Sequence, residues 1–337
     1  MLASALLIPT IYIIGLFYIA WQADKRYSHT TSRHSGLMYG LSLGVYFTSW
    51  TFFGAVGTAA RSGWDFLPIY IGPFLLMTVG FPIVRRMIEL GRSFHSTSIA
   101  DFLSTRYGKS GGLAALVTFI AVTGVIPYIA LQLRSVSMSF SAIVGRSSLS
   151  EYDLVPLAAA LLAGFAILFG TRHVDTTVHK RGLVSVVSLE TAVKLFALLM
   201  VAAFALSLYT TDELIATMTA PTSPFVFEFN DRFVTLTVIS MVAILCLPRQ
   251  FHLMVVECQH GKDIQTGRWV FLASLAITVI VVVPITLAGI ASNVSGSPDL
   301  YVLTLPLAEG ANWLALLVFL GGVSAATGMV IVSTVAL

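Results

Sequence analysis

Residues 40–64 read G-L-S-L-G-V-Y-F-T-S-W-T-F-F-G-A-V-G-T-A-A-R-S-G-W, a run long enough to cross a bilayer. It is a poor continuous helix, because β-branched and aromatic residues crowd its centre and glycines recur at Gly40, Gly44, Gly54 and Gly57. Inside a bilayer every backbone N–H and C=O needs a partner within the protein. Either these glycines allow tight helix packing, or the span is broken so that free carbonyls and hydroxyls face a solute.

The composition of the whole chain indicates a membrane protein. Of its 337 residues, 57% are hydrophobic and 10% are charged, and the mean hydropathy is +0.89. Soluble domains average about 25% charged residues. The basic residues cluster in short loops, so the net charge of +3 does not indicate a nucleic acid partner, and the two cysteines fit neither a metal site nor a disulfide framework. We therefore predict an all-α polytopic protein surrounded by the lipid bilayer.

Nine apolar runs are long enough to be membrane spans. They cover residues 2–21, 36–59, 67–88, 112–144, 153–170, 183–208, 232–249, 268–292 and 312–337. The segments that follow spans 1, 3, 5 and 7 carry 14 Lys and Arg residues, and the alternate segments carry three. The positive-inside rule then predicts an N-terminus outside the cell and cytoplasmic basic segments. The first run lacks a basic flank and a cleavage site, so we interpret it as an uncleaved span.

Two short helices are expected outside the spans. One begins after Ser98, which can cap it, has Asp101 in its first turn, and lies near the cytoplasmic surface. The other covers residues 211–218 in the outer loop 209–231.

Spans 2 and 7 share a pattern, an interruption with polar residues beside it. In span 7, Pro248 removes a backbone donor, and Gln250 and His252 follow it. His252 alone fits an ordinary interfacial histidine equally well. Four predicted spans separate the two, which is the spacing expected of the opening helices of two inverted five-helix repeats. The corresponding polar and aromatic residues of span 2 are Tyr46, Thr48, Ser49 and Trp50.

A few polar residues inside other spans leave two interpretations open. Tyr128 and Gln132, four residues apart in span 4, form one polar face that either lines a cavity or packs between helices. Glu190 and Lys194 also share a helix face, as a structural ion pair or as part of a proton or substrate pathway. Arg134 lies in an overlong span and can extend to the outer interface.

Span 9 carries a patch of small residues, G-G-V-S-A-A-T-G-M at 321–329. Such a patch is typical of a close helix-packing seam. Its hydroxyl oxygens at Ser324 and Thr327 are also suitable cation ligands, which a broken span 2 with free carbonyls could complete.

Several motifs together are specific. They are Y-F-T-S-W-T-F-F-G-A-V-G at 46–57, D-F-L-P-I-Y-I-G-P at 65–73, S-I-A-D-F-L-S-T-R-Y-G-K-S at 98–110, I-P-Y-I-A-L-Q-L at 126–133, L-P-R-Q-F-H at 247–252 and the span 9 patch. On these motifs the chain resembles the sodium/solute symporter superfamily over essentially its whole length. More narrowly, it resembles the symporter-like N-terminal sensor region of certain bacterial hybrid histidine kinases.

The resemblance implies a LeuT-like inverted-repeat bundle in one transmembrane domain, 1–337. Residues 1–35 would form an extra leading helix and loop, 36–208 a complete first repeat, and 209–337 the opening part of a truncated second repeat. The last apolar run reaches Leu337 without a polar exit, so we expect the chain to be a fragment of a longer one.

The resemblance also implies a cation site and a solute site. The sodium ligands would be carbonyls of Gly44 and Phe47 with span 9 positions Ala325, Thr327 and Gly328. Transporters of the family usually carry adjacent hydroxyls where this chain has Gly328 and Met329. The solute-binding candidates are Tyr46, Thr48, Ser49, Trp50, Tyr128, Gln132, Pro248 and Gln250. Na+ is the candidate ion, and no other cofactor is expected in these residues.

The function that the resemblance implies is a transporter-like sensory module in the bacterial inner membrane. It would bind a small organic solute, such as an amino acid or short carboxylate, and signal to C-terminal kinase and receiver domains and a response regulator. ATP would bind only in those domains. The alternative is a stand-alone sodium- or proton-coupled symporter. No catalytic residue is predicted, because no nucleotide-binding or hydrolase motif occurs.

Overall fold

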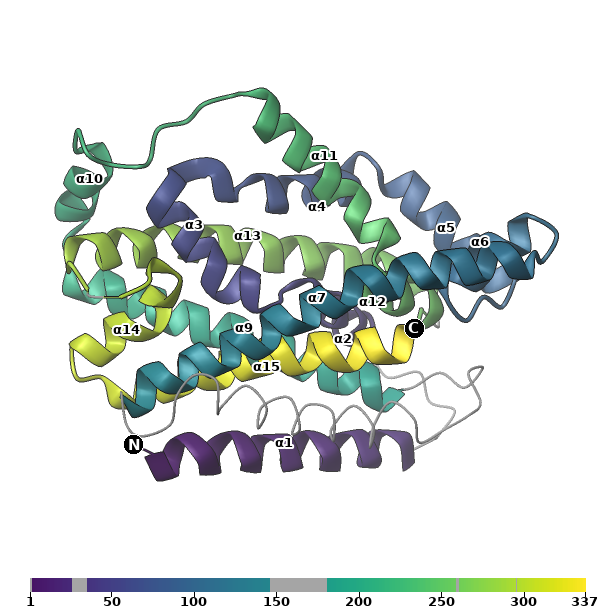
Figure 1. Cartoon of the computed structure of the whole chain (residues 1–337), viewed down its shortest axis with the longest axis horizontal. Coiled ribbons are helices and arrows are strands. Elements are labelled where there is room, and N and C mark those ends of the chain that lie inside the picture. Colours follow the sequence, from purple (N-terminus) through teal and green to yellow (C-terminus); the bar gives the residue numbers. More distant parts are fainter. Residues whose placement is uncertain (1, 26–34, 146–180, 259–260, 295) are drawn as a thin grey trace.

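The computed structural model describes residues 2–25, 35–145, 181–258, 261–294 and 296–337, and within these ranges every regular element is helical (Figure 1). The long helices are α1 Leu2–Lys25, α7 Gly111–Val144, α9 Arg181–Leu208, α13 Gly261–Ala291 and α15 Asn312–Ala336. The shorter ones are α2 Ser35–Ser42, α3 Ala55–Ser62, α4 Pro68–Thr78, α5 Phe81–Ser93, α6 Ile99–Arg106, α10 Thr211–Thr219, α11 Asp231–Cys246, α12 Pro248–Phe251 and α14 Tyr301–Ala308. Single tighter turns are η1 Leu43–Tyr46, η3 Gly63–Phe66 and η5 Pro298–Leu300, and π-helical turns are η2 Trp50–Gly54 and η4 His252–Val256.

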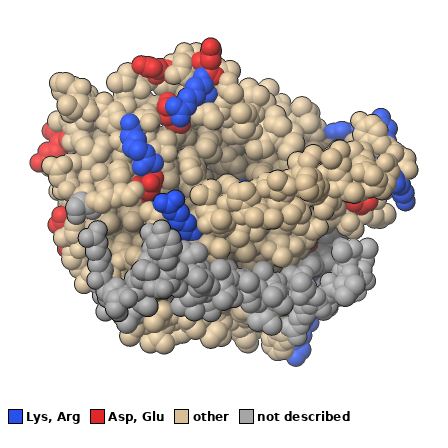
Figure 2. Space-filling model, viewed as in Figure 1, with Lys and Arg blue, Asp and Glu red and all other residues tan. Residues whose placement is uncertain are grey.

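The helices are long and apolar enough for a multi-pass membrane protein. Within the described residues, five helices are long enough to span alone, and two bent pairs, α4 with α5 and α11 with α12–η4, raise the number to seven. Of the nine predicted spans, 36–59 is divided between α2, η1, η2 and α3, and 153–170 lies outside the described residues. On the face shown in Figure 2, most charged side chains lie toward the left and right ends, with a broad uncharged band between them. The long helices run along the same axis (Figure 1), so this band is the part that faces lipid.

The two short surface helices form where the sequence predicts them, because their caps are encoded locally. The Ser98 hydroxyl accepts a hydrogen bond from the backbone N–H of Asp101, which begins α6. At α10, Thr210 and Glu213 form a reciprocal capping box. The backbone N–H and the hydroxyl of Thr210 both donate to the Glu213 carboxylate, and these bonds lower the pKa of Glu213.

Two predicted spans differ from the structure, one by a bend within it and one by where it ends. Span 3 is not one helix, because α4 and α5 meet at 70° around Gly80, where a tight turn is followed by Pro82. Span 7 does not end at 249 but continues to Val256 after a 56° bend. Pro248 begins the second half, in the first turn of α12, where its missing N–H would have had no intrahelical partner anyway. The break therefore lies within span 7 and not at its end.

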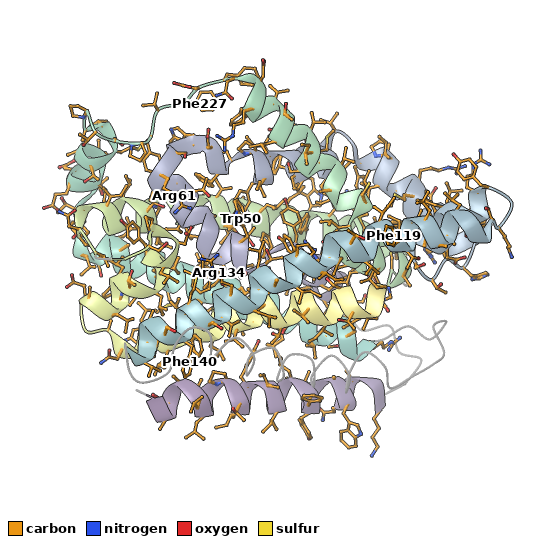
Figure 3. The ribbon with its side chains drawn as sticks, in the orientation of Figure 1. Trp50, Arg61, Phe119, Arg134, Phe140 and Phe227 are labelled. Atoms are coloured by element: carbon orange, nitrogen blue, oxygen red, sulfur yellow. The ribbon has the colours of Figure 1, made fainter. Side chains whose placement is uncertain are left out.

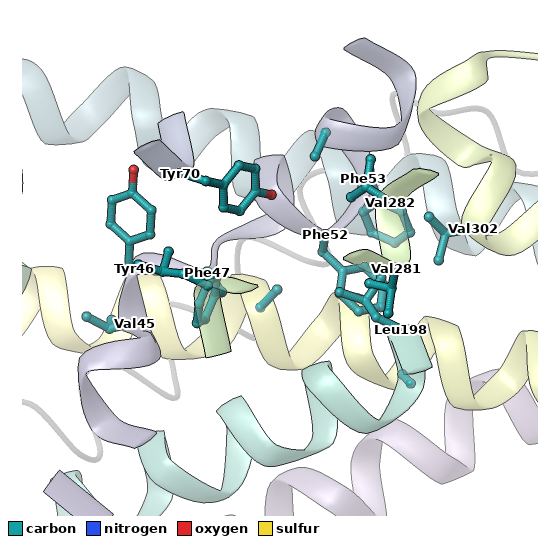
Figure 4. Packing of buried hydrophobic residues seen from close by; sticks show 14 of the residues in the cluster. Val45, Tyr46, Phe47, Phe52, Phe53, Tyr70, Leu198, Val281, Val282 and Val302 are labelled. Carbon is teal, nitrogen blue, oxygen red and sulfur yellow. The ribbon is translucent and has the colours of Figure 1, made fainter. Parts of the chain in front are cut away.

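The second half of the broken span 2 is anchored in the apolar core. Phe52 and Phe53 of η2 stack edge to face with ring centroids 4.8 Å apart, and both are almost fully buried. Figure 4 shows them among side chains of α9, α13 and α14. The labelled neighbours are Leu198, Val281, Val282 and Val302. This packing holds the segment after the break in a fixed position relative to three other helices.

The first half of span 2 packs on α13 through glycines. A Cβ at Gly40 would lie 2.6 Å from Cβ of Val270 and 2.9 Å from Cα of Gly267, closer than any real packing contact. The glycines thus allow the two backbones to approach directly, as small residues do at membrane helix interfaces.

Gly40→Val is expected to destabilise the protein by about 1–3 kcal/mol, because the added side chain overpacks the α2–α13 seam. Thermal unfolding of the detergent-purified protein measures the effect. The matched control is Gly15→Val in α1, where a Cβ meets nothing within 4 Å. Equal unfolding temperatures for the two variants would contradict the close approach.

Candidate functional site

The backbone of span 2 leaves helical geometry between its two halves. Helix α2 ends at Ser42, the turn η1 follows, and Phe47 is extended, with φ −78° and ψ 90°. The π-helical turn η2 resumes the span and α3 completes it. The predicted break is therefore present, with Gly44, Tyr46, Phe47, Thr48 and Ser49 all at its centre.

Lys194 of α9 contacts the carbonyls of this break. Its side chain is almost fully buried, and its Nζ donates to the carbonyl oxygens of Phe47 at 3.0 Å and Gly44 at 3.4 Å. A Cβ at Gly44 would overlap the side chain of Thr191, one helical turn from Lys194, so α9 lies directly against the break. The two carbonyls predicted for a cation thus face a positive charge that belongs to the protein itself.

The span 9 positions predicted for the same ion contact the acidic partner on α9. Thr327 donates to Oε1 of Glu190 at 2.6 Å, and Ser324 donates to the Glu190 carbonyl at 3.1 Å. A Cβ at Gly328 would overlap the Glu190 carboxylate, and Ala325 is fully buried beside them. The i, i+4 pair on α9 therefore presents its cation to span 2 and its anion to span 9, and the patch is both a packing seam and a carboxylate site.

The polar residues predicted on spans 2 and 4 lie together in one cluster. The Thr48 and Tyr128 hydroxyls are 3.0 Å apart. The backbone N–H and the hydroxyl of Ser49 both donate to Oε1 of Gln132, at 3.0 and 2.8 Å. Thr48, Ser49 and Gln132 are buried, whereas Tyr128 is half-buried. We call these four residues the polar cluster. Figure 2 shows this face of the molecule hollowed directly above α7, the helix that supplies Tyr128 and Gln132.

The remaining predicted residues occupy different positions around the break. Gln250 of α12 donates to the carbonyl of Leu43 at 3.2 Å, which ties the break in span 7 to the break in span 2. The Tyr46 hydroxyl donates to the carbonyl of Ile69 at 2.5 Å. Trp50 is half-buried and lies between α3 and α7 (Figure 3). Pro248 is buried at the break of span 7, where it begins the first turn of α12.

Two charged features escaped the sequence interpretation. Arg249 was counted as a cytoplasmic loop charge, but it is only 3% exposed, with its guanidinium carbon 4.7 Å from the centre of the Tyr128 ring. The position next to a proline break inside an apolar run is the signal that could have revealed it. Arg61, at the end of α3, pairs with Asp299 of η5 through two contacts of 2.8 and 3.2 Å. That pair joins elements 238 residues apart in the chain, and no local pattern encodes it.

Comparisons with known proteins bear on the fold of the chain. No protein-family model matches the chain. The chain is 25% identical over 181 residues to an uncharacterized symporter, YodF, of Bacillus subtilis (strain 168). That match covers 50% of this chain and 36% of the relative, so it spans about a third of the relative's length.

A solved structure of similar fold is a Na+-coupled sialic acid symporter in a substrate-bound, outward-open state. It covers 98% of this chain and 72% of its own, with a TM-score of 0.65 and 14% sequence identity. A likeness at that identity concerns the fold, and the predicted LeuT-like architecture is confirmed by it. The chain is a multi-pass, all-α membrane protein with the helical fold of a symporter.

Proposed function

We propose that this chain binds a small organic solute, an amino acid or a short carboxylate, at the polar cluster between spans 2, 4 and 7. One observation carries the proposal, namely that hydroxyl and amide groups from two broken spans and a third helix converge inside a symporter fold. Broken spans place such groups at solute sites in secondary transporters. The test is a thermal-unfolding screen of the detergent-purified protein against amino acids and small carboxylates. A solute that binds the folded state raises the unfolding temperature.

We further infer that the parent protein couples this module to a histidine kinase. The support is the resemblance of the motifs at 46–57, 98–110 and 247–252 to symporter-like sensor regions. In this proposal the domain lies in the bacterial inner membrane with its N-terminus outside, residues 36–208 form the first repeat, and residues 209–337 open the second. Kinase and receiver domains would follow, with ATP bound only there and a response regulator as the partner.

The second candidate is a self-sufficient symporter, and the sequence match to an uncharacterized symporter favours it. The sequence after Leu337 in the full gene separates the two. A dimerisation helix with a phosphoacceptor histidine and an ATP-binding domain would support the sensor. A few more spans and then a stop codon would support the symporter.

The sodium position requires a separate proposal. The structural neighbour is Na+-coupled, which makes Na+ a reasonable candidate here. The Gly44 and Phe47 carbonyls, however, already accept hydrogen bonds from Lys194. A second cation within a few ångströms of a buried ammonium is repelled, so these residues do not fit a sodium ion. We propose that the lysine supplies the positive charge that this position requires.

Exchange of Na+ for K+ at constant ionic strength is therefore expected to leave solute affinity unchanged. The same panel of unfolding temperatures in the two salts measures this. The comparison variant is Lys194→Ser, which removes the ammonium and leaves the Gly44 and Phe47 carbonyls without this donor. In that variant, Na+ is expected to change the unfolding temperature. Solute affinity of the unmodified protein that falls when K+ replaces Na+ would contradict the proposal.

A further inference from the structure

Arg249 is a buried cation with no anionic partner. Its side chain is 3% exposed, and its Nε has no hydrogen-bond partner. Among the residues that the structure describes, no carboxylate lies within 4 Å of its guanidinium. Its recorded neighbour is the Tyr128 ring, 4.7 Å away.

The other buried ionisable side chains of the described bundle have one of the opposite type nearby. Lys194 shares a helix face with Glu190, and His252 lies 3.3 Å from the Glu257 carboxylate. An unpaired buried ion is strongly unfavourable even after local relaxation. A single cation–π contact offsets only a small part of that cost, so Tyr128 alone does not balance the burial of Arg249. An ionisable group kept at such a cost within a span marks a functional site.

The guanidinium borders the polar cluster. The Tyr128 ring that it faces carries the hydroxyl that meets Thr48, and Gln132 follows one turn later on α7. Arg249 itself stands between Pro248 and Gln250, and Gln250 bonds to the break in span 2. This buried cation, which has no carboxylate partner in the described part of the chain, thus lies where both broken spans and α7 meet.

We propose that Arg249 receives the carboxylate of the solute. This inference rests on the proposed solute site and specifies its chemistry. A guanidinium presents a planar fork of N–H donors that matches the two oxygens of a carboxylate, and the bond is strengthened by charge. The Tyr128 ring holds one face of the guanidinium, while Thr48, Ser49 and Gln132 remain for the polar parts of the solute. An anionic group thereby supplies the charge that the buried arginine lacks.

The experiment compares acids with matched derivatives in which a neutral amide or ester replaces the carboxylate. The purified protein is titrated with succinate and succinamide, with L-alanine and L-alaninamide, and with N-acetylneuraminate and its methyl ester, and unfolding temperature and isothermal titration give affinity. The variants are Arg249→Gln and Arg249→Lys. The control is Arg232→Gln, which removes an arginine from an exposed pair with Asp65 at the start of α11.

At least one acid is expected to bind the unmodified protein more tightly than its amide or ester derivative. Arg249→Gln should weaken that acid about 30-fold or more and abolish the preference. Arg249→Lys should retain the preference for the acid at lower affinity, since the positive charge remains and the planar guanidinium is lost. A preference retained in Arg249→Lys also shows that its loss in Arg249→Gln comes from the missing charge and not from a folding defect. Arg232→Gln should bind as the unmodified protein does.

The outcomes separate the two proposals. If amides bind as tightly as acids, or Arg249→Gln keeps the preference for acids, a solute site exists and the role of Arg249 is refuted. If no amino acid or carboxylate, charged or uncharged, binds the unmodified protein, the proposed solute site itself is refuted, and this inference with it.

Discussion

Lys194→Met is expected to lower the free energy of unfolding by about 3–5 kcal/mol, the cost of leaving one member of a buried charge pair without the other. The change removes the donor that serves the Gly44 and Phe47 carbonyls and leaves the Glu190 carboxylate deep in the bundle with Thr327 as its side-chain donor. Both losses act on the same place, the contact of α9 with the break in span 2. Thermal and chaotrope unfolding of the purified protein, followed by tryptophan fluorescence, measures the change.

The double variant Glu190→Gln/Lys194→Met is the control for that result. It removes both buried charges, so it should be more stable than Lys194→Met, and with the single variant Glu190→Gln it completes the cycle that gives the coupling between the two residues. A double variant less stable than the single one, or a single variant as stable as the unmodified protein, would show that the two charges do not depend on each other.

Ser49→Leu is expected to abolish solute binding while the protein still inserts in the membrane and folds. Ser49 is buried and gives both its hydroxyl and its backbone N–H to Gln132. Leucine removes the hydroxyl bond and adds volume where the polar cluster meets the break, so it both fills the site and leaves Gln132 with a weaker partner. Equilibrium binding of the tightest solute in the screen, with expression level and elution profile in parallel, measures the effect.

The matched control for Ser49→Leu is Ser62→Leu. Ser62 lies on the same interrupted span, at the end of α3, and is exposed. Its replacement should leave binding unchanged. Solute binding that survives Ser49→Leu would show that span 2 does not form the site.

The breaks in spans 2 and 7 were predictable because they depend on residues at the breaks themselves. Glycines, β-branched residues and a proline disfavour a continuous helix wherever they stand, and the caps of α6 and α10 need only residues within one turn. Tyr128 and Gln132 were identified in the same way, since a spacing of four residues places them on one face. The 70° bend between α4 and α5 was missed because an apolar run looks the same whether straight or bent.

The contacts between distant segments were not predictable from residue patterns. Lys194 and Phe47 are 147 positions apart in the sequence, and only the packing of α9 on the break brings them together. The spacing of Glu190 and Lys194 indicated an ion pair, but it did not indicate that each side chain contacts a different span. Arg249 was counted with the following loop because it was the last residue of the predicted span, whereas the span continues beyond the bend to Val256.

The ammonium at the break of span 2 has a consequence for energy conversion. Lys194 is covalently attached to α9 and buried in the bundle, so it cannot be released on either side of the membrane. The membrane potential does work of about 2.3 kcal/mol per elementary charge per 100 mV only on charges that cross the field. If Lys194 supplies the positive charge at this position, as proposed above, no free cation binds or leaves there, and the position takes no free energy from an ion gradient. In that proposal, occupancy of the neighbouring solute site follows the concentration of the solute itself, as it does in a receptor.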